Sequence, residues 1–361
     1  MRQHPSEFRH IALMRLSALG DCVNAFGVAG AIAAALPQAA VTFITEQRFA
    51  GLFTDPAGLT AIPLIGADFS TGRAHAICAL HRSCRSLPCD VLLCMQTSIR
   101  ASLCSLAISA PLRVGYDAKR SRELQRLFVN TRIAPPAGTH VMAGYLEFAR
   151  TLGIADPRPR WDFRLSPDEL SRARAHFAPR RRILLLSPAS AHPAKNWTAD
   201  GYIQACRYAA SELDMQVGLI GDRSPLCQRL CRQIMDGLDF KPVMLAGQTT
   251  LRELLAVIAC ADLMLSPDSG PLHMASALGT PVVGLFAIHS EKRVGPWRFM
   301  DLCVSVHERH ARSELGGRSI PWRYRVRNPR AMEDITADEV TAMLARAYTS
   351  YIRTEAAAPE L

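Results

Sequence analysis

Short apolar runs bounded by polar turns alternate with helical stretches along most of this 361-residue chain. This alternation is typical of parallel sheets whose strands are connected by crossover helices. In the first half it predicts strands at residues 10–16, 41–45, 90–95 and 112–116 and helices at 20–36, 73–86, 98–108 and 141–152. In the second half it predicts strands at 181–188, 216–221, 262–266 and 282–286 and helices at 199–212, 226–235, 251–259, 270–278 and 337–351. The fold class is therefore α/β, with two doubly wound halves.

The alternation stops at residues 153–170, where three prolines and little periodicity indicate a linker. Ser166 and Glu169 fit a capping box that opens the next helix. We expect an N-terminal domain over residues 1–160, a C-terminal domain over 161–335, and a final helix and tail over 336–361 that can pack back on the N-terminal domain. Open parallel sheets bind ligands outside the carboxyl ends of their strands, so we expect the two domains to face a central cleft that holds the site.

The composition indicates a folded protein with a basic surface. Hydrophobic residues make up 49% of the chain and charged residues 20%, which excludes general disorder. Lys and Arg number 42 against 32 acidic residues, giving a net charge of +10. This charge fits either simple solubility or an anionic partner, such as a phosphate ligand, a nucleic acid or an acidic membrane surface. The basic residues form no long block, which argues against nucleic acid.

The start of the chain is polar, and no apolar run reaches the ~18 residues that a membrane span needs. We therefore expect neither a signal peptide nor a spanning helix. The eleven cysteines are unevenly scattered, which indicates reduced thiols and a cytoplasmic location. Two Cys/His groups, at residues 78–89 and 303–310, lack the paired spacing of a structural zinc site, so we expect buried or incidental thiols and no metal.

The stretch SPDSGPLH places a carboxylate, a hydroxyl, a glycine and an imidazole where a predicted strand ends and a helix begins: Asp268, Ser269, Gly270 and His273. The first turn of a helix has free N–H groups and the positive end of the helix dipole, so it can bind an anion. Gly270 would let a ligand approach the backbone closely. The alternative is a helix cap formed by the Asp or Ser side chain, with a surface histidine.

Two further turns have the same character. In LSALGD, Asp21 would lie in the first turn of a helix, either as a general base or as an acid that stabilises the helix dipole. In SPASAHPAKNW, Lys195 follows a strand and could bind a phosphate, or could simply be exposed to solvent. No G-x-G-x-x-G or G-x-x-x-x-G-K-[ST] loop occurs, which argues against a nicotinamide-dependent oxidoreductase and a P-loop NTPase.

These stretches together resemble the ADP-heptose:lipopolysaccharide heptosyltransferase family, the family 9 glycosyltransferases, from about residue 11 to the final helix. RLSALGD is similar to the family's R-x-S-x-x-G-D, and PAKNW to its A-K-x-W. MQTSIRASL (95–103) resembles its Q-x-x-x-[KR]-S stretch, and RVGYDAKRSRE (113–123) its loop ending in Arg-Glu. The block at 245–286, with D-S-G-x-x-H followed by A-L-x-x-P, is the most specific of these matches.

The resemblance implies a GT-B fold, with two Rossmann-like domains, the acceptor in the N-terminal half and the donor in the C-terminal half. It implies an inverting, metal-independent transfer of L-glycero-D-manno-heptose from ADP-heptose to the lipopolysaccharide inner core, with no cofactor besides this donor substrate. Asp21 would be the general base, and Arg100 and Arg122 would bind the acceptor. The donor-binding residues would be Ser190, Lys195, Thr249, Asp268, Ser269, Gly270 and His273.

The implied partners are a nucleotide-sugar donor and the lipopolysaccharide acceptor, without nucleic acid. The acceptor lipid implies a cytoplasmic enzyme with peripheral contact at the inner face of the inner membrane. A basic surface suits such contact, because that membrane is anionic.

The sequence departs from the family pattern after residue 286. Many members continue with Gly-Pro-Thr, whereas this chain has Ala-Ile-His at 287–289. Many also carry cysteines before the last helix, and this chain has none around Ala331. These changes border the donor side, so a family relative that uses another nucleotide-sugar or acceptor is an alternative. A catalytically silent nucleotide-sugar-binding protein is another, although such a binder would not need Asp21 as a base.

Overall fold

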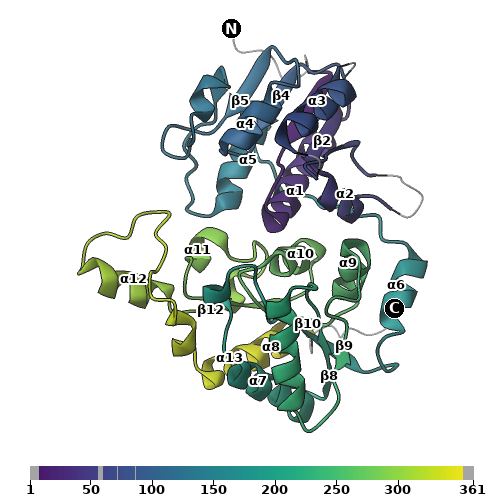
Figure 1. Ribbon diagram of the computed structural model, residues 1–361, viewed down its shortest axis with the longest axis vertical. Coiled ribbons are helices and arrows are strands. Elements are labelled where there is room, and N and C mark those ends of the chain that lie inside the picture. Colours follow the sequence, from purple (N-terminus) through teal and green to yellow (C-terminus); the bar gives the residue numbers. More distant parts are fainter. Residues whose placement is uncertain (1–7, 56–59, 71, 86, 353–361) are drawn as a thin grey trace. The chain divides into compact units, whose positions relative to one another are not determined.

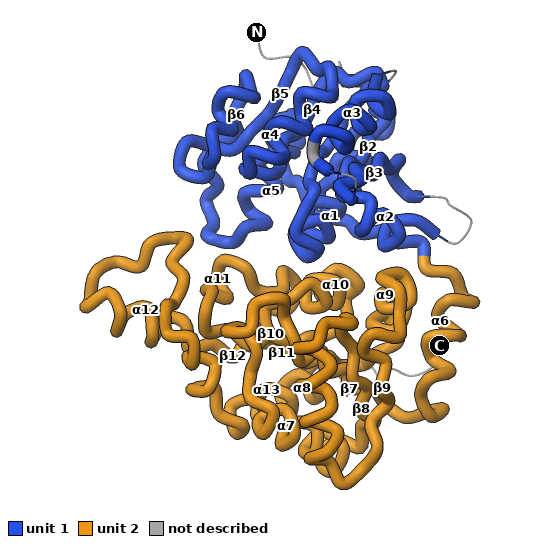
Figure 2. Tube along the Cα trace, in the orientation of Figure 1, with its two compact units in different colours: residues 1–164 blue, residues 165–361 orange. Residues whose placement is uncertain are grey.

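The structure is a computed structural model that describes residues 8–55, 60–70, 72–85 and 87–352. The chain forms two compact units, residues 1–164 and 165–361 (Figure 2). The division falls slightly later than the predicted boundary after residue 160, because the segment that follows packs on the first unit. Trp161 Nε1 donates a hydrogen bond to Val23 O (2.8 Å), and the ring of Phe163 stacks on Phe26 with centroids 5.7 Å apart.

The first unit is a six-stranded parallel sheet in the order β3-β2-β1-β4-β5-β6. Its strands are β1 (His10–Met14), β2 (Ala40–Glu46), β3 (Leu64–Ala67), β4 (Val91–Cys94), β5 (Leu112–Gly115) and β6 (Thr131–Arg132). Its helices are α1 (Leu19–Ala35), α2 (Gln47–Phe53), α3 (Arg73–Cys84), α4 (Ile99–Ser105) and α5 (Val141–Thr151), with a short 3₁₀ helix at Gln125–Leu127 (Figure 1). The strand order reverses beside β1, which is where ligands bind in open α/β sheets.

Apolar layers cover both faces of this sheet. On one side, rings of Phe26, Phe43 and Phe53 pack against one another with centroids 4.6 to 5.6 Å apart. On the other side, the buried aliphatic side chains include those of Met14 and Leu92. Successive residues of a strand point to opposite faces, so central strands buried on both faces read as unbroken apolar runs.

The second unit repeats this architecture, with a parallel sheet in the order β12-β11-β10-β7-β8-β9. Its strands are β7 (Arg182–Leu186), β8 (Met215–Leu219), β9 (Val243–Met244), β10 (Leu263–Pro267), β11 (Val282–Phe286) and β12 (Cys303–Ser305). Its helices are α6 (Pro167–Arg174), α7 (Ala199–Ser211), α8 (Pro225–Asp236), α9 (Leu251–Ala259), α10 (Gly270–Leu278), α11 (Glu291–Val294), α12 (His307–Leu315) and α13 (Ala337–Ala347). A short π-helical turn, Tyr348–Ile352, follows α13. The strand order reverses between β7 and β10.

The predicted elements of both halves are confirmed, with ends that shift by a few residues. The strands that the sequence did not predict are β3, β6, β9 and β12. Each of them lies at an edge of its sheet. Edge strands are short and are covered less completely than central strands, so their sequences lack the continuous apolar run. The stretch at 298–330, for which the alternation predicted no helix or strand, also contains β12 and α12.

The described part of the C-terminal segment belongs to the second unit. Helix α13 packs against α7, β11 and β12, and it buries Val340, Leu344 and Ala347. Trp197 Nε1 also donates to Ile335 O at 2.9 Å, which fixes the approach to this helix. Residues 336–352 thus lie in the second unit, and the apolar stripe of α13 contributes to the core beside its sheet. Contact of the segment 336–361 with the N-terminal domain stays a prediction.

The predicted capping box at Ser166 and Glu169 is present at the start of α6, and it carries an ion pair. Glu169 accepts hydrogen bonds from the Ser166 N–H (2.9 Å) and from Arg252 on α9 (2.7 and 3.0 Å). Both paired side chains are largely buried. The bonds from Arg252 are the largest cause that lowers the pKa of Glu169, to about 2 from a usual 4.5.

We expect Glu169→Gln to destabilise the second unit at neutral pH by ~1.5–3 kcal/mol, as for a lost charge-assisted hydrogen bond. Because the folded-state pKa is depressed, this stabilisation is complete above the unfolded value and is lost as pH falls toward 2. Urea unfolding midpoints of variant and parent should therefore converge as pH is lowered from about 5. The matched control is Glu333→Gln, which removes an exposed pair with Arg330 and should change little. A difference that stays constant with pH would contradict this account.

No helix in the described ranges is long and apolar enough to span a membrane.

Candidate active site

Four ionisable side chains of the second unit meet beyond the ends of β7, β10 and β11, three from the loops that follow these strands and His273 from α10. Lys195 Nζ lies 2.7 Å from Asp268 Oδ2, and His289 Nδ1 lies 2.9 Å from the same oxygen. His273 Nε2 is 4.0 Å from Asp268 Oδ1. Between 10 and 21% of each side chain is exposed, so the group is mostly shielded from water. Asp268 is the shared partner, and we call these residues the Asp268 cluster.

The neighbouring basic side chains determine the charge state of Asp268. Burial alone would raise the pKa of its carboxyl, but the hydrogen bond from His289 and the positive charge of Lys195 lower it below its usual range. The carboxylate therefore stays ionised at neutral pH. It accepts hydrogen bonds from Lys195 and His289 and holds both donors in one place.

The local sequence explains why the cluster forms at this turn. Strand β10 ends at Pro267 and α10 begins at Gly270, so Asp268 and Ser269 form the whole connection. Ser269 is the N-cap residue, but its side chain makes no capping hydrogen bond. Its Oγ lies instead 2.8 Å from Ser266 Oγ. The alternative in which the Ser side chain caps the helix is therefore not observed, and the start of α10 keeps the N–H groups that bind anions.

The remaining two residues that were predicted to bind the nucleotide-sugar donor, Ser190 and Thr249, lie at two different places. Ser190 is buried in the loop between β7 and Lys195, where its N–H donates to Asn196 Oδ1 (2.7 Å) and its Oγ accepts from the His192 N–H (3.5 Å). Thr249 lies in the turn before α9, next to the N-cap Thr250. That turn follows β9, which β7 and β8 separate from β10 in the sheet. Lys195 is thus part of the Asp268 cluster, whereas the contacts seen among the described residues do not link Thr249 to it.

His289 is a member of the cluster that the sequence analysis did not single out as a site residue. It lies three residues after the end of β11, in the Ala-Ile-His run that departs from the family's Gly-Pro-Thr. That departure was the available signal, because a titratable side chain directly after a central parallel strand lies at the ligand-binding edge of the sheet.

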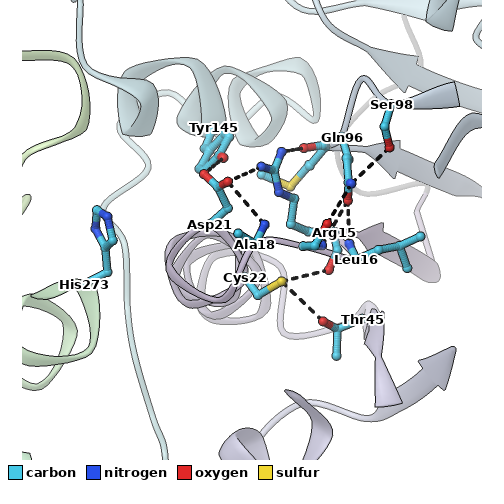
Figure 3. Close-up of polar contacts among 12 residues, drawn as sticks. Arg15, Leu16, Ala18, Asp21, Cys22, Thr45, Gln96, Ser98, Tyr145 and His273 are labelled. Atoms are coloured by element: carbon cyan, nitrogen blue, oxygen red, sulfur yellow. Dashed lines mark hydrogen bonds and ion pairs between the residues drawn. The ribbon is translucent and has the colours of Figure 1, made fainter. Parts of the chain in front are cut away.

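In the first unit, Asp21 lies in the first turn of α1, and its carboxylate contacts Tyr145, Arg15 and the backbone of Ala18 (Figure 3). Its Oδ1 accepts a hydrogen bond from Tyr145 Oη on α5 at 2.7 Å. Its Oδ2 pairs with Arg15 Nη2 at 2.5 Å and accepts a longer bond, 3.4 Å, from the Ala18 N–H. Arg15 also donates to Met95 O, and its guanidinium lies 5.6 Å from the centre of the Tyr145 ring.

Exposure separates Asp21 from its partners. Its side chain is 34% exposed, against 13% for Arg15, and Tyr145 is buried. Burial is the largest cause that raises the pKa of the Tyr145 hydroxyl well above its usual value. The charge of Arg15 opposes this shift, and the charge of Asp21 adds to it. Tyr145 is therefore a neutral donor at any physiological pH. Two buried donors thus hold a carboxylate that a substrate can reach, and this arrangement suits a general base.

Gln96, two residues after the end of β4, connects the loop that leads to Asp21 to the sheet. Its Oε1 accepts from the N–H groups of Leu16 (2.8 Å) and Ser17 (3.1 Å), and its Nε2 donates to the hydroxyls of Ser17 and Ser98, both at 3.1 Å (Figure 3). The Gln96 side chain therefore holds the turn between Arg15 and Asp21 through hydrogen bonds to the backbone of that turn. The Q-x-x-x-[KR]-S stretch contains this glutamine.

The two predicted acceptor-binding arginines have different surroundings. Arg100 on α4 donates to Ser17 Oγ (3.1 Å) and pairs with Glu46 at the carboxyl end of β2 (2.5 Å), so it borders the Asp21 turn. Arg122 is exposed in the loop after β5 and lines an open cavity of about 280 Å³. The described contacts link Arg100 to the motif of Asp21, and they do not link Arg122 to it.

The cysteines of the described chain are free thiols, and most of them are buried. In the residues that the structure describes, no group of three or more His, Cys, Asp or Glu side chains is arranged to hold a metal ion.

Comparison with known proteins identifies the family. The model of glycosyltransferase family 9 (heptosyltransferase) matches residues 77–318. The chain is also 35% identical over 340 residues to the lipopolysaccharide core heptosyltransferase OpsX of Haemophilus influenzae, covering 93% of this chain and 96% of that protein. The chain belongs to glycosyltransferase family 9. It is therefore a glycosyltransferase, as the motifs around Asp21, Lys195 and Asp268 predicted.

A second family 9 relative matches over part of its length. The chain is 28% identical to lipopolysaccharide heptosyltransferase 3 of Escherichia coli K12, over 46% of this chain and 49% of that protein.

Solved structures confirm the fold. A family 9 glycosyltransferase from Veillonella parvula aligns with a TM-score of 0.78 at 17% identity, covering 97% of this chain and 99% of that one. The E. coli heptosyltransferase WaaC with ADP aligns with a TM-score of 0.70 at 16% identity, covering 94% and 99%. The predicted GT-B class, with two Rossmann-like domains, is thereby confirmed.

Proposed function

We propose that this family 9 member transfers L-glycero-D-manno-heptose from ADP-heptose to the inner core of lipopolysaccharide, with inversion and without a metal ion. The observation that carries the proposal is the similarity to the H. influenzae lipopolysaccharide core heptosyltransferase over nearly the full length of both chains. The Asp21 and Asp268 groups supply the chemistry that such a transfer needs.

The first unit provides the base. The acceptor hydroxyl attacks the anomeric carbon as its proton passes to the exposed carboxylate of Asp21, and the bond from that carbon to the ADP oxygen breaks. Tyr145 and Arg15 hold the carboxylate in place during this step. A positioned base of this kind contributes ~10²- to 10⁴-fold to the rate.

The second unit stabilises the leaving group. ADP departs with additional negative charge on its diphosphate, and Lys195, together with the N-terminus of α10 at Ser269 and Gly270, provides a preorganised positive region for it. Asp268 and His273 orient the donor, with Ser190 as a further hydroxyl on the phosphate side and Thr249 near the adenine. These donors need no metal ion to neutralise the diphosphate.

The acceptor is an anionic saccharide with phosphate and carboxylate groups, for which guanidinium groups are well suited. Arg100 and Arg122 are proposed to bind it. Arg100 lies beside Ser17 in the turn that carries Asp21, so it is placed to orient the acceptor hydroxyl. The acceptor is anchored in a membrane, and we propose a cytoplasmic enzyme that contacts the inner membrane peripherally.

The presence of His289 favours one further candidate function, in which this family member uses a different donor sugar. It contributes an imidazole to the Asp268 cluster at a position where many family members have threonine. A change at the donor side alters the groups that contact the sugar or its phosphates, whereas it leaves the Asp21 side of the reaction unchanged.

A panel of nucleotides separates these candidates. We expect ADP and ADP-heptose to raise the melting temperature, and UDP, GDP and NAD to leave it unchanged at the same concentration, because a ligand stabilises only the fold that binds it. At a ligand concentration of about 100 times Kd the stabilisation is ~2.7 kcal/mol. A shift with ADP but not with ADP-heptose would favour another ADP-linked sugar. A selective shift with UDP or GDP would contradict the proposed donor.

A further inference from the structure

The large aliphatic side chains that are exposed in the described chain gather in one region of the first unit. They are Ile99 (38% exposed), Leu103 (41%), Leu106 (60%), Leu124 (56%) and Leu127 (70%). Single exposed aliphatic residues are common on protein surfaces, whereas a contiguous group of them marks a surface that binds something.

Two neighbouring segments carry this group. Ile99, Leu103 and Leu106 follow helical spacing along α4 and its C-cap, while the residues between them are largely buried. Leu124 and Leu127 lie in and beside the 3₁₀ helix after β5. The two segments are joined directly, because the Ile99 N–H donates to Glu123 Oε2 at 2.7 Å. We call these five side chains and their basic neighbours the α4 surface.

The charged neighbours of the leucines are mostly positive. Arg122, Arg126 and Arg132 line the open 280 Å³ cavity together with Leu124, and none of the three pairs with a carboxylate in the described part of the chain. Lys119 is exposed in the same loop. The acidic groups nearby are already engaged, since Glu123 binds the N-terminus of α4 and Asp117 pairs with Arg120. The α4 surface therefore combines exposed aliphatic groups with available guanidinium groups.

The backbone holds one of the leucines in an unfavourable conformation. Glu123 and Leu124 both have positive φ angles, 44° and 61°. This left-handed region is uncommon for residues other than glycine and is most compatible with Asn and Asp. The loop thus keeps a bulky side chain exposed at a position that would accept a polar one more easily.

We propose that the α4 surface docks the first unit on an anionic lipid bilayer, with the five aliphatic side chains in the headgroup region and Lys119, Arg126 and Arg132 on lipid phosphates. This inference rests on the proposed function for its biological setting, because the acceptor is a membrane lipid. The surface itself is defined by exposure and charge alone.

Charge selects the bilayer over other occupants. A second copy docked through the same surface would bring two sets of these cations together, which is unfavourable. A nucleic acid would meet the arginines but would gain nothing from five aliphatic side chains. An anionic membrane interface matches both parts, because apolar side chains insert at the headgroup boundary and basic residues near the surface are attracted to its charge.

The test uses the full chain and sedimentation with two kinds of vesicle, phosphatidylcholine alone and phosphatidylcholine mixed with phosphatidylglycerol. We expect binding to the anionic vesicles that weakens as salt is raised. Leu124→Asn with Leu127→Gln should weaken it at least tenfold, from the apolar burial lost. Asn suits the left-handed conformation at 124, so this variant should keep its melting temperature. Arg126→Gln and Arg132→Gln should each weaken binding roughly fivefold.

Two controls accompany these variants. Arg158→Gln removes the same charge from an exposed site on the same unit, and Leu127→Met keeps the apolar group, so both should bind like the parent. Transfer to a deacylated acceptor that forms no bilayer should be unchanged in the leucine variant. If the parent also failed to transfer to the deacylated acceptor, the result would contradict the proposed function and not the α4 surface. Parent-like vesicle binding by the leucine variant, or a dimer that this variant dissolves without any vesicle binding, would overturn the inference.

Discussion

Asp21→Asn should reduce kcat by ~10²- to 10⁴-fold while donor affinity and fold are retained. The amide has the shape of the carboxylate and can still accept the hydrogen bond from Tyr145, but it cannot take a proton from the acceptor hydroxyl. The measurement is steady-state transfer with saturating donor, together with ADP affinity from titration calorimetry. Because the substitution acts on the proton transfer, the loss should appear in kcat rather than in the KM for the donor.

Two variants separate catalysis from structure at this position. Asp21→Asn leaves Arg15 without this ionised partner, so a lower melting temperature is expected as a secondary effect. Tyr145→Phe removes only one hydrogen bond to the carboxylate, and it should lower kcat much less and leave its pH profile in place. Asp156→Asn, at an exposed ion pair on the same unit, should change neither. If Asp21→Asn retained parent turnover, Asp21 would be only an acid that stabilises the helix and its turn.

Lys195→Met should weaken ADP binding by ~10- to 100-fold, as expected for a lost hydrogen bond between charged groups. It should also lower kcat, because the ammonium stabilises the charge that develops on the leaving diphosphate. Methionine retains the length and apolar stem of lysine, so the packing in the loop after β7 is preserved. The affinity is measured by titration with ADP.

We expect Lys195→Met to fold normally, because the other members of the Asp268 cluster still contact one another. Asp268 keeps its hydrogen bond from His289, so the carboxylate is not left without a partner. Lys195→Arg keeps the charge and should recover part of the affinity, although its planar group does not reproduce the geometry of an ammonium. Lys292→Met removes an exposed lysine from the same unit and should bind ADP normally. Parent affinity in Lys195→Met would leave Lys195 with a purely structural role beside Asp268.

The central part of the fold could be predicted from the sequence because β1, β4, β7, β10 and β11 are buried on both faces. Such strands read as continuous aliphatic runs, and the helices between them carry caps that the sequence displays. The edge strands could not be predicted in this way, since β6 and β9 contain only two residues each and their pairing depends on the neighbouring strand.

The sequence could indicate only those parts of the candidate site that are local in sequence. Asp21 and Asp268 each stand at the end of a strand and the start of a helix, which is a pattern within a few residues. The partners of Asp21 come from distant segments, as Tyr145 is 124 residues away and Gln96 lies after a different strand. Pairing between such segments follows from the topology of the sheet, and no short motif contains it.

The most direct test of the proposed function is transfer from ADP-heptose to heptose-deficient lipopolysaccharide, in the presence of EDTA and with UDP- and GDP-linked sugars as competing donors. The account predicts that only ADP-heptose is consumed, that the new linkage has the anomeric configuration opposite to that of the donor, and that EDTA leaves the rate unchanged. Consumption of another nucleotide sugar in preference to ADP-heptose, retention of configuration, or a rate that EDTA abolishes and a divalent cation restores would contradict it.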